Sequence, residues 1–423
     1  MIKIVNIKEC GRDDVFIRKQ EEFNVTDAVA AIIAEVRAGG DKAVLDCTER
    51  FDKVRPENLR VTPEEIDAAM ARIPAEVIAT MEEAAERIKA FHRPQVRTSY
   101  TQTYDGIVLT EQIIPLQCVG LYVPGGTAAY PSTVLMNAVP AKLAGVEDLV
   151  MVSPPTCNGN ISPVILAAAK VAGVDKIFKV GGAQAVAALA YGTESIPRAD
   201  KIVGPGNAFV AEAKKQVYGV CGIDMIAGPS EILVVADENS DPAIIAADML
   251  SQAEHDKLAS AVLVTTSEDL AYKVGEELDR QLPLLPRAEI ASASIENNGK
   301  ILIAETIEEA IELANDIAPE HFELFVDNPF DVMNLVKNAG SVFMGKNCPE
   351  ALGDYFAGPN HTLPTSGTAR FSSPLSVDDF IKKTQFTYFT PEALSQVSDK
   401  VALFARQEGL EAHARSAESR FKK

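Results

Sequence analysis

Glu320 and His321 are adjacent in the chain, and they carry the two side chains that most often transfer protons in enzymes. A helical run, residues 307–317, precedes them, and an apolar, β-prone run follows. Pro319 cannot continue the helix and biases Ala318 away from the right-handed α region. The sequence therefore predicts that the pair lies on a tight helix-to-strand connection at a sheet end. Taken alone, a Glu-His dipeptide would favour a salt-bridging pair on the surface.

Gln252 and His255 are three residues apart on a predicted helix that begins after Asp241. Both side chains would share one face of that helix. Imidazole is a good ligand for zinc and other transition metals, whereas a glutamine carbonyl is a poor one. From this spacing alone, a surface helix face is at least as good an interpretation as a metal site.

The sequence around the other three histidines indicates a functional role to different degrees. Asp354 and His361 belong to a stretch punctuated by glycine and proline, which is long for a loop and is either functional or an ordinary surface loop. Glu408 and His413 are five residues apart in a charged helical tail, so a solvated helix would explain them. His92 is expected at the surface or at a helix C-terminus.

Three glycine-rich turns, centred on Gly125, Gly182 and Gly206, follow short predicted strands. The last of them opens a helix, where backbone amides can meet a pyrophosphate, although Phe209 replaces the third glycine of the dinucleotide-binding pattern. Each turn is a weak signal. Together they favour a ligand site, because ligands bind at the carboxyl ends of parallel strands.

Composition narrows the class of protein. The 423 residues suit two to three domains, and 47% of them are hydrophobic, enough for ordinary buried cores. The net charge of −20 argues against a nucleic-acid partner or an anionic membrane. Six scattered cysteines without a C-x-x-C motif predict neither a disulfide framework nor a thiolate zinc site, which fits the cytoplasm. We expect no signal peptide and no membrane span.

Helical patterns that alternate with short buried strands predict an α/β fold with parallel sheets. Residues 232–346 show this alternation of helices and short strands. Their strands are expected at residues 232–235, 261–265, 300–303, 323–326 and 341–343. Helices are expected to begin after Thr62, Asp241 and Thr390, each of which precedes a proline. The tail after Phe380 is expected to pack on something else, such as a second subunit.

Seven stretches, in order over about three hundred residues, together resemble the histidinol dehydrogenase family. They are Tyr122-Val123-Pro124-Gly125-Gly126, Val180-Gly181-Gly182-Ala183-Gln184-Ala185, Val203-Gly204-Pro205-Gly206-Asn207, Ala227-Gly228-Pro229-Ser230-Glu231, Ser251-Gln252-Ala253-Glu254-His255, Ala318-Pro319-Glu320-His321 and Glu408-Gly409-Leu410-Glu411-Ala412-His413. No single motif would suffice, but the ordered set is very specific.

The resemblance implies NAD-dependent oxidation of L-histidinol to L-histidine through L-histidinal, the last steps of histidine biosynthesis. It implies catalysis by Glu320 and His321. One zinc ion would be bound by Gln252, His255, Asp354 and His413. Substrate contacts would be Ser230, Gln252, His255, His321, Asp354, His361, Glu408 and His413. NAD contacts would be Tyr122, Gln184 and Asn207.

The resemblance also implies a homodimer whose active site is shared, because the C-terminal segment would reach into the partner's site. The expected fold has two incomplete Rossmann-like domains (doubly wound parallel sheets) plus small N- and C-terminal helical appendages used in dimerisation. Residues 1–20 would form an N-terminal arm. Residues 21–121 with 232–375 would form the zinc-binding and catalytic domain, residues 122–231 the NAD-binding domain, and residues 376–423 the tail.

The expected chemistry divides the two oxidations between the adjacent groups. Zinc would orient the amine and the imidazole of the substrate. His321 would take the hydroxyl proton as hydride leaves for NAD, so activity would need a pH above about 6.5 if its pKa is unperturbed. Glu320 would activate the water that adds to the aldehyde, and His321 would act again on the resulting diol.

Two other functions remain open from the sequence. A zinc hydrolase, with Glu320 activating a metal-bound water, would use the same ligands but leaves the three glycine turns unexplained. A non-catalytic zinc-stabilised dimer or binding protein is the second alternative, and the intact Glu320 and His321 count against it.

Overall fold

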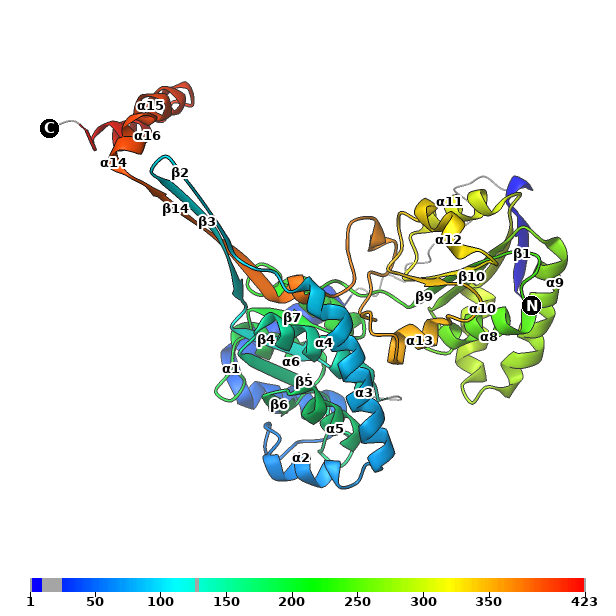
Figure 1. Ribbon diagram of the computed structural model, residues 1–423. Helices are drawn as coiled ribbons and strands as arrows, with labels where there is room; N and C mark the ends of the chain where they lie inside the picture. The colour runs from blue at the N-terminus through cyan, green and yellow to red at the C-terminus, as the bar shows by residue number, and fades with distance from the viewer. Residues whose placement is uncertain (1, 10–24, 126–128, 422–423) are drawn as a thin grey trace. The chain divides into compact units, whose positions relative to one another are not determined.

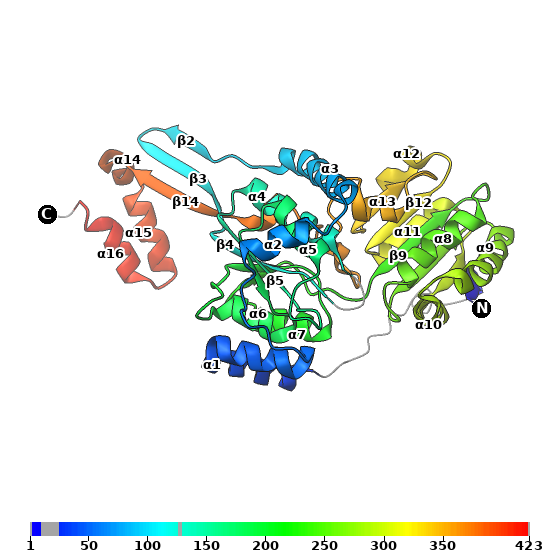
Figure 2. The ribbon, with the colours of Figure 1, turned by 90° about the horizontal axis from the view of Figure 1, so that it is seen from below.

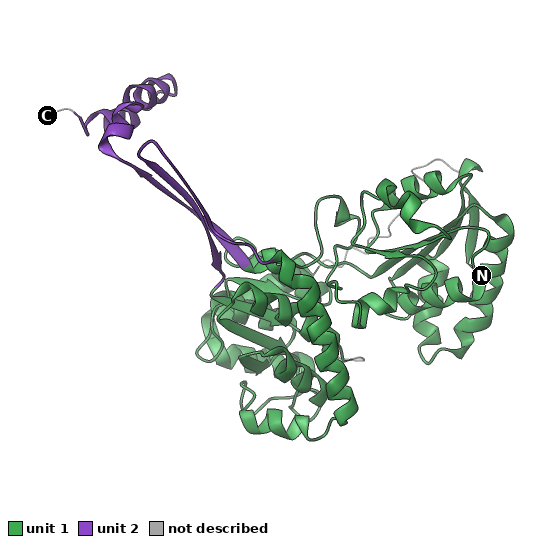
Figure 3. Cartoon of the chain, viewed as in Figure 1, with its two compact units in different colours: residues 1–95, 117–380 green, residues 96–116, 381–423 purple. Residues whose placement is uncertain are grey.

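The computed structural model describes residues 2–9, 25–125 and 129–421 of the chain (Figure 1). Two compact units are distinguished: unit 1 comprises residues 1–95 and 117–380, and unit 2 residues 96–116 and 381–423 (Figure 3). Gly126 and most of the expected N-terminal arm lie outside the described residues. Unit 1 holds two parallel sheets, and unit 2 holds one antiparallel sheet.

The first sheet of unit 1 has six strands in the order β1-β11-β10-β9-β12-β13, and all neighbours are parallel. Its strands are β1 (Lys3–Asn6), β9 (Glu231–Ala236), β10 (Ser260–Thr265), β11 (Lys300–Ile303), β12 (His321–Phe325) and β13 (Ser341–Met344). From β9 the chain builds outward through β10 and β11, and then returns to add β12 and β13 on the other side. This is a doubly wound sheet whose direction switches between β9 and β12. The five strands predicted between residues 232 and 346 are confirmed.

Helices cover both faces of this sheet, because alternate strand residues point to opposite sides. The helices are α8 (Pro242–Ala253), α9 (Glu268–Gln281), α10 (Ala288–Asn298), α11 (Ile307–Ile317), α12 (Pro329–Val332) and α13 (Glu350–Tyr355). Ile232 and Val234 belong to the core under α8, α9 and α10, whereas Leu233 and Val235 belong to the core under α11 (Figure 1). Asp241 caps α8, as predicted, by accepting the Ala243 N–H.

The second sheet of unit 1 has five parallel strands in the order β6-β5-β4-β7-β8. The strands are β4 (Cys118–Tyr122), β5 (Asp148–Ser153), β6 (Lys176–Lys179), β7 (Lys201–Val203) and β8 (Gly222–Ile223). Here the switch lies between β4 and β7. The winding matches that of the six-stranded sheet, so the expected α/β fold with two incomplete Rossmann-like sheets is confirmed.

Among the described residues, seven helices pack with the five-stranded sheet, and the first three come from the chain before β4. They are α1 (Thr26–Asp52), α2 (Pro63–Met70), α3 (Ala75–His92), α4 (Pro131–Ala144), α5 (Pro163–Ala172), α6 (Gly182–Tyr191) and α7 (Ala208–Val217). α1 lies against α6 and α7 (Figure 2), and its Val29 shares a core with Phe178 of β6. The sequence had instead grouped residues 21–121 with residues 232–375. An apolar helix face predicts burial but does not identify the sheet that covers it.

Unit 2 contains a three-stranded antiparallel sheet in the order β14-β3-β2. Its elements are β2 (Tyr100–Tyr104), β3 (Ile107–Pro115), β14 (Ile381–Phe389), α14 (Pro391–Ser395), α15 (Ser398–Gln407) and α16 (Glu411–Glu418). The expected tail thus begins near residue 381 and shares its sheet with residues 96–116. Within the described residues, no helix has the length and apolarity needed to cross a membrane.

Candidate active site

Glu320 and His321 lie where the sequence predicted, on the connection between α11 and β12. Ala318 ends the helix in the left-handed region, with a φ of 51°, and β12 begins at His321. Both side chains are buried: Glu320 is 7% exposed and His321 4% exposed. Burial excludes a salt-bridging pair on the surface. The pair lies at the amino edge of the six-stranded sheet, beside the point where its winding switches from β9 to β12.

The environment of His321 fixes which ring nitrogen is basic. Its Nδ1 lies 3.0 Å from the carbonyl oxygen of Glu231. A carbonyl can only accept, so Nδ1 carries the hydrogen and the lone pair of the neutral ring is on Nε2. Burial lowers the pKa of His321 to about 4, although the nearby Asp354 opposes this shift. His321 is therefore a neutral base at physiological pH, and its ordinary pKa of about 6.5 does not apply.

Two carboxyl groups face the basic nitrogen of His321. Nε2 lies 3.8 Å from Oε1 of Glu350 and 3.9 Å from Oδ1 of Asp354. Burial, together with the charge of Asp354, raises the pKa of Glu350 to about 8. No sequence motif pointed to Glu350. The signal that could have found it is its position four residues before Asp354, which places both side chains on one face of a helix.

Glu320 points its carboxyl group toward the neighbouring strand. Its Oε2 accepts the backbone N–H of Glu231 at 2.9 Å and lies 3.6 Å from Nδ1 of His321. Burial raises the pKa of Glu320 well above its usual range. Proton transfer by such a carboxyl group is a form of general acid–base catalysis.

Asp354 lies on the short helix α13, not in the loop that the sequence predicted. Tertiary contacts explain a helix where glycine makes local propensity low. The N–H of Glu350 donates to Glu323 Oε1 at 2.8 Å. A Cβ on Gly353 would lie 2.4 Å from the ring of Phe343, so glycine allows α13 to pack closely. The Phe343 ring in turn stacks on His321 with centroids 6.0 Å apart.

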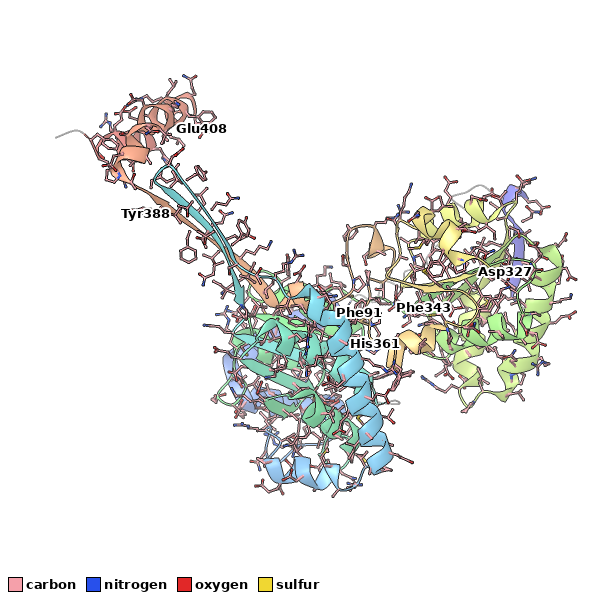
Figure 4. The ribbon with its side chains drawn as sticks, in the orientation of Figure 1. Phe91, Asp327, Phe343, His361, Tyr388 and Glu408 are labelled. Carbon is pink, nitrogen blue, oxygen red and sulfur yellow. The ribbon has the colours of Figure 1, made fainter. Side chains whose placement is uncertain are left out.

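His361 contacts Asp354 from the loop that follows α13. Its Nδ1 lies 3.2 Å from the carbonyl oxygen and 3.6 Å from Oδ1 of Asp354. Burial alone would raise the pKa of Asp354, but the hydrogen bond from His361 and the neighbouring imidazoles lower it to about 2. Both residues, with His321 and Phe343, line a cavity of about 100 Å³. Figure 4 labels two of these lining residues, Phe343 and His361.

Gln252 lies on the last turn of α8, and His255 lies just beyond the end of the predicted helix. The helix ends at Ala253, and His255 lies in the following turn, with its N–H donating to the Gln252 carbonyl. His255 is near enough to lower the pKa of Asp354. Ser230 immediately precedes β9, at the same edge of the sheet as His321.

The donors at this edge fit a bound metal ion. Gln252 is 1% exposed, and within the described residues its Oε1 has no hydrogen-bond partner. Such a buried, unsatisfied oxygen is costly unless something binds it. Asp354 is held ionised, and His255 adds an imidazole. The carboxylate and the imidazole are ordinary zinc ligands, and the Gln252 oxygen is a weaker donor that lacks another partner among the described residues.

Glu408, His413 and His92 do not belong to the described cluster around His321 in unit 1. Glu408 and His413 are exposed residues of unit 2, so the structure of unit 1 does not include them. His92 is the last residue of α3, as one expectation had it, but it is 0% exposed and its Nδ1 lies 2.8 Å from the Ile88 carbonyl. The surface alternative for His92 was wrong, because the apolar face of α3 continues to its end.

The glycine turns lie together at the carboxyl edge of the five-stranded sheet, as predicted. Tyr122 ends β4, and its hydroxyl accepts the N–H of Gly182 at 3.0 Å. Gly204 follows β7, and a Cβ there would lie 2.1 Å from the Tyr122 carbonyl oxygen. The turns that follow β4 and β7 thus meet at the switch point between these strands, where doubly wound sheets bind ligands. Gln184 is buried in α6, and Asn207 is exposed at the start of α7.

The two sheets define a doubly wound α/β protein with a buried Glu-His pair on one sheet and glycine turns at the switch point of the other. More particularly, the chain belongs to the histidinol dehydrogenase family, a family of oxidoreductases, whose model matches residues 17–421. The chain is 55% identical over 404 residues to a histidinol dehydrogenase of Clostridium acetobutylicum, covering 95% of this chain and 94% of the relative.

Two further relatives cover nearly whole chains. The chain is 53% identical over 430 residues to a histidinol dehydrogenase of Geobacter sulfurreducens, with 100% of each chain covered. The crystal structure of histidinol dehydrogenase from Elizabethkingia anophelis matches with a TM-score of 0.93 and 37% identity, covering 99% of this chain and 98% of that one. These matches agree with the resemblance that the seven motifs indicated.

Proposed function

We propose that this enzyme oxidises L-histidinol to L-histidine through L-histidinal, with NAD as the acceptor of both hydrides. The observation that carries the proposal is the buried, neutral His321, whose basic Nε2 faces Asp354 and Glu350 in a chain of this family. An alcohol oxidation needs a base that can take a hydroxyl proton while hydride leaves the carbon. This activity would supply the last steps of histidine biosynthesis, in the cytoplasm.

His321 acts as the general base in both oxidations. Its Nδ1 is held by the Glu231 carbonyl, so the ring keeps Nε2 available without changing tautomer. In the first oxidation, Nε2 takes the hydroxyl proton of histidinol. In the second, it takes a proton from the hydrated aldehyde. Phe343 holds the ring in place by stacking on it.

Glu320 activates the water that adds to the aldehyde between the two oxidations. The Glu231 N–H holds one carboxyl oxygen, so the other is free to approach a water molecule. Because burial raises the pKa of Glu320, its carboxylate is a stronger base than an exposed one. The reaction needs a base for the hydroxyl group of the alcohol, for the water that adds to the aldehyde and for the diol. Two adjacent proton-transfer groups meet this need.

Gln252, His255 and Asp354 would hold a zinc ion together with His413, and when bound the ion would orient the amine and imidazole of the substrate. The unsatisfied Gln252 oxygen supports this assignment. Ser230, His361 and Glu408 would complete the substrate site together with His321 and the ligands. Ser230 and His361 suit this role because they lie beside the acid–base pair.

Tyr122, Gln184 and Asn207 would bind NAD, which accepts hydride when bound. Tyr122 and Asn207 flank the switch point of the five-stranded sheet, where a dinucleotide fits. The Oδ1 of Asn207 already accepts the N–H groups of Phe209 and Val210. Its side-chain amide nitrogen is therefore the group left to donate to a ligand.

The enzyme would act as a homodimer in which the tail completes the partner's site. Unit 2 supports this proposal, because its sheet exposes large aromatic side chains that a monomer would leave in contact with water. Exposed apolar patches of this kind mark interaction surfaces. These are Tyr100, Tyr104, Phe386 and Tyr388. In such a dimer, His413 and Glu408 of one chain would serve the cavity of the other.

The direct test is to identify the product. Purified enzyme incubated with L-histidinol and NAD should form L-histidine, detected by mass, with NADH. Hydrolysis of an amide or ester without NADH would favour a zinc hydrolase instead. Zinc-dependent dimer formation without any turnover would favour the non-catalytic alternative.

A further inference from the structure

A buried ion pair lies beneath the glycine turn that follows β7. Lys214 of α7 contacts Asp224, which follows β8, and their side chains are 2% and 1% exposed. Burying two charges costs several kcal/mol per ion, and apolar residues of similar size often stabilise a fold as well or better. Stability alone therefore does not explain why charged side chains occupy this place.

Both members of the pair hold the same residue. Asp224 Oδ2 accepts the N–H of Gly204 at 2.8 Å, and the Lys214 ammonium group donates to the Gly204 carbonyl at 2.9 Å. The second oxygen of Asp224 accepts the N–H of Met225 at 2.6 Å. The ion pair thus occupies both backbone polar groups of one glycine, and two apolar residues could not do so.

The glycine that they hold has an unusual conformation. Gly204 has a φ of 112°, which side chains rarely adopt, and a Cβ there would clash with the Tyr122 carbonyl oxygen. A free glycine visits many conformations, so a turn of this kind loses much entropy when a ligand orders it. Fixing Gly204 in advance removes that cost from binding.

We propose that the Lys214–Asp224 ion pair is a positioning device that holds the Gly204 turn ready for the dinucleotide, and this proposal rests on the NAD-binding role proposed above. The device acts through the backbone: with Gly204 fixed, Asn207 is placed three residues on, at the start of α7. Lys214 and Asp224 are positioning residues, because their polar atoms bind each other and the backbone of Gly204 and Met225.

Two neutral double variants separate the hydrogen bonds from the charge. In K214M/D224N, no charge is left buried, the Gly204 carbonyl loses its donor, and one side-chain oxygen accepts where two did before. In K214Q/D224N, an amide can donate to that carbonyl again. We expect K214M/D224N to bind NAD about tenfold more weakly in a direct titration, and K214Q/D224N to recover most of this loss. The KM for histidinol should change less than the affinity for NAD.

Lys201→Met is the matched control. Lys201 begins the same strand, β7, and its ion pair with Asp379 lies at the opposite end from Gly204. Its loss should lower the thermal midpoint without changing NAD affinity. If K214M/D224N folds and binds NAD as tightly as the wild type, the proposal is wrong.

Hydrogen exchange of the wild-type enzyme tests the same idea without variants. The Gly204 amide, which donates to the buried Asp224, should already exchange slowly without NAD and change little when NAD is added. Rapid exchange that becomes slow only with NAD would overturn the proposal. Absence of any NAD binding by the wild type would instead refute the proposed cofactor, and slow exchange in that case would still support a preorganised turn.

Discussion

Burial and neighbouring polar groups together set the protonation states of the groups near His321. The imidazole is kept neutral, the carboxyl groups of Glu320 and Glu350 keep their protons to higher pH, and Asp354 alone is held ionised. Environments that push the pKa values of neighbouring groups apart are how a site assigns acid and base roles. The sequence identified the pair but could not show this, because burial is a property of the packed chain.

The pH dependence of the first hydride transfer follows from the lowered pKa of His321. The pKa is about 4 in the fold, so the neutral base stays populated as pH falls through 6.5. We expect the single-turnover rate of hydride transfer to stay level from pH 8 to about 5.5 and to fall below that. Stopped-flow measurement of NADH formation checks this. A midpoint near 6.5 would show that the ring titrates as if exposed.

Glu320→Gln should separate the two oxidations. The amide cannot take a proton from water, so hydration of the aldehyde should slow by about a hundredfold or more, whereas the alcohol step should slow much less. Stopped-flow traces started from L-histidinol and from L-histidinal measure the two steps separately. Equal loss of both half-reactions would rule out this division of labour.

At the scale of elements, β12 and α13 position the groups that react. β12 carries His321, and Glu323 two residues later, on the same face, accepts the Glu350 N–H that begins α13. Gly353 lets α13 approach β13 closely enough for Asp354 to reach His321. Each contact joins residues distant in sequence, so no local pattern predicted α13.

Gly353→Ala should move α13 away from the sheet. The added Cβ would lie 2.4 Å from the Phe343 ring, which itself stacks on His321. We expect kcat to fall by about tenfold or more, since small displacements of reacting groups have large effects. Unfolding free energy should drop by about 1–3 kcal/mol through overpacking. Turnover and urea unfolding measure the two effects.

Gly275→Ala is the control for that variant. Gly275 lies within α9, and among the described residues a Cβ there would meet just Ile4 and Ile2, at 3.8 and 3.9 Å. Alanine in a helix interior should stabilise the protein by about 0.5–1 kcal/mol without changing kcat. Unchanged turnover in Gly353→Ala would show that the close packing of α13 does not position Asp354.

Local patterns predicted elements better than their assembly. Short apolar runs predicted the five strands between residues 232 and 346, and Asp241 and Thr390 predicted helix starts, because caps and strands depend on near neighbours. The placement of α1, the burial of His92 and the position of Glu350 beside His321 depend on long-range packing. The candidate site was predicted mainly from the ordered motifs of the family, since spacing left Gln252 and His255 ambiguous.

At the scale of the whole molecule, the proposed dimer predicts complementation between two inactive variants. In a hybrid of Glu320→Gln and His413→Ala chains, one site would combine an intact body with an intact partner tail. A one-to-one mixture, exchanged by mild denaturation, should recover about a quarter of wild-type activity. If each tail served its own chain, the hybrid would have no intact site and the mixture would stay inactive.

The number of NADH molecules formed per L-histidinol consumed tests the central claim most directly. Purified enzyme should yield about two NADH per substrate, because both oxidations occur before histidine leaves, and a chelator should abolish the signal until zinc is restored. A ratio of one, with free histidinal in solution, would contradict the proposed four-electron oxidation and the role of Glu320. Absence of NADH would contradict the proposed activity itself.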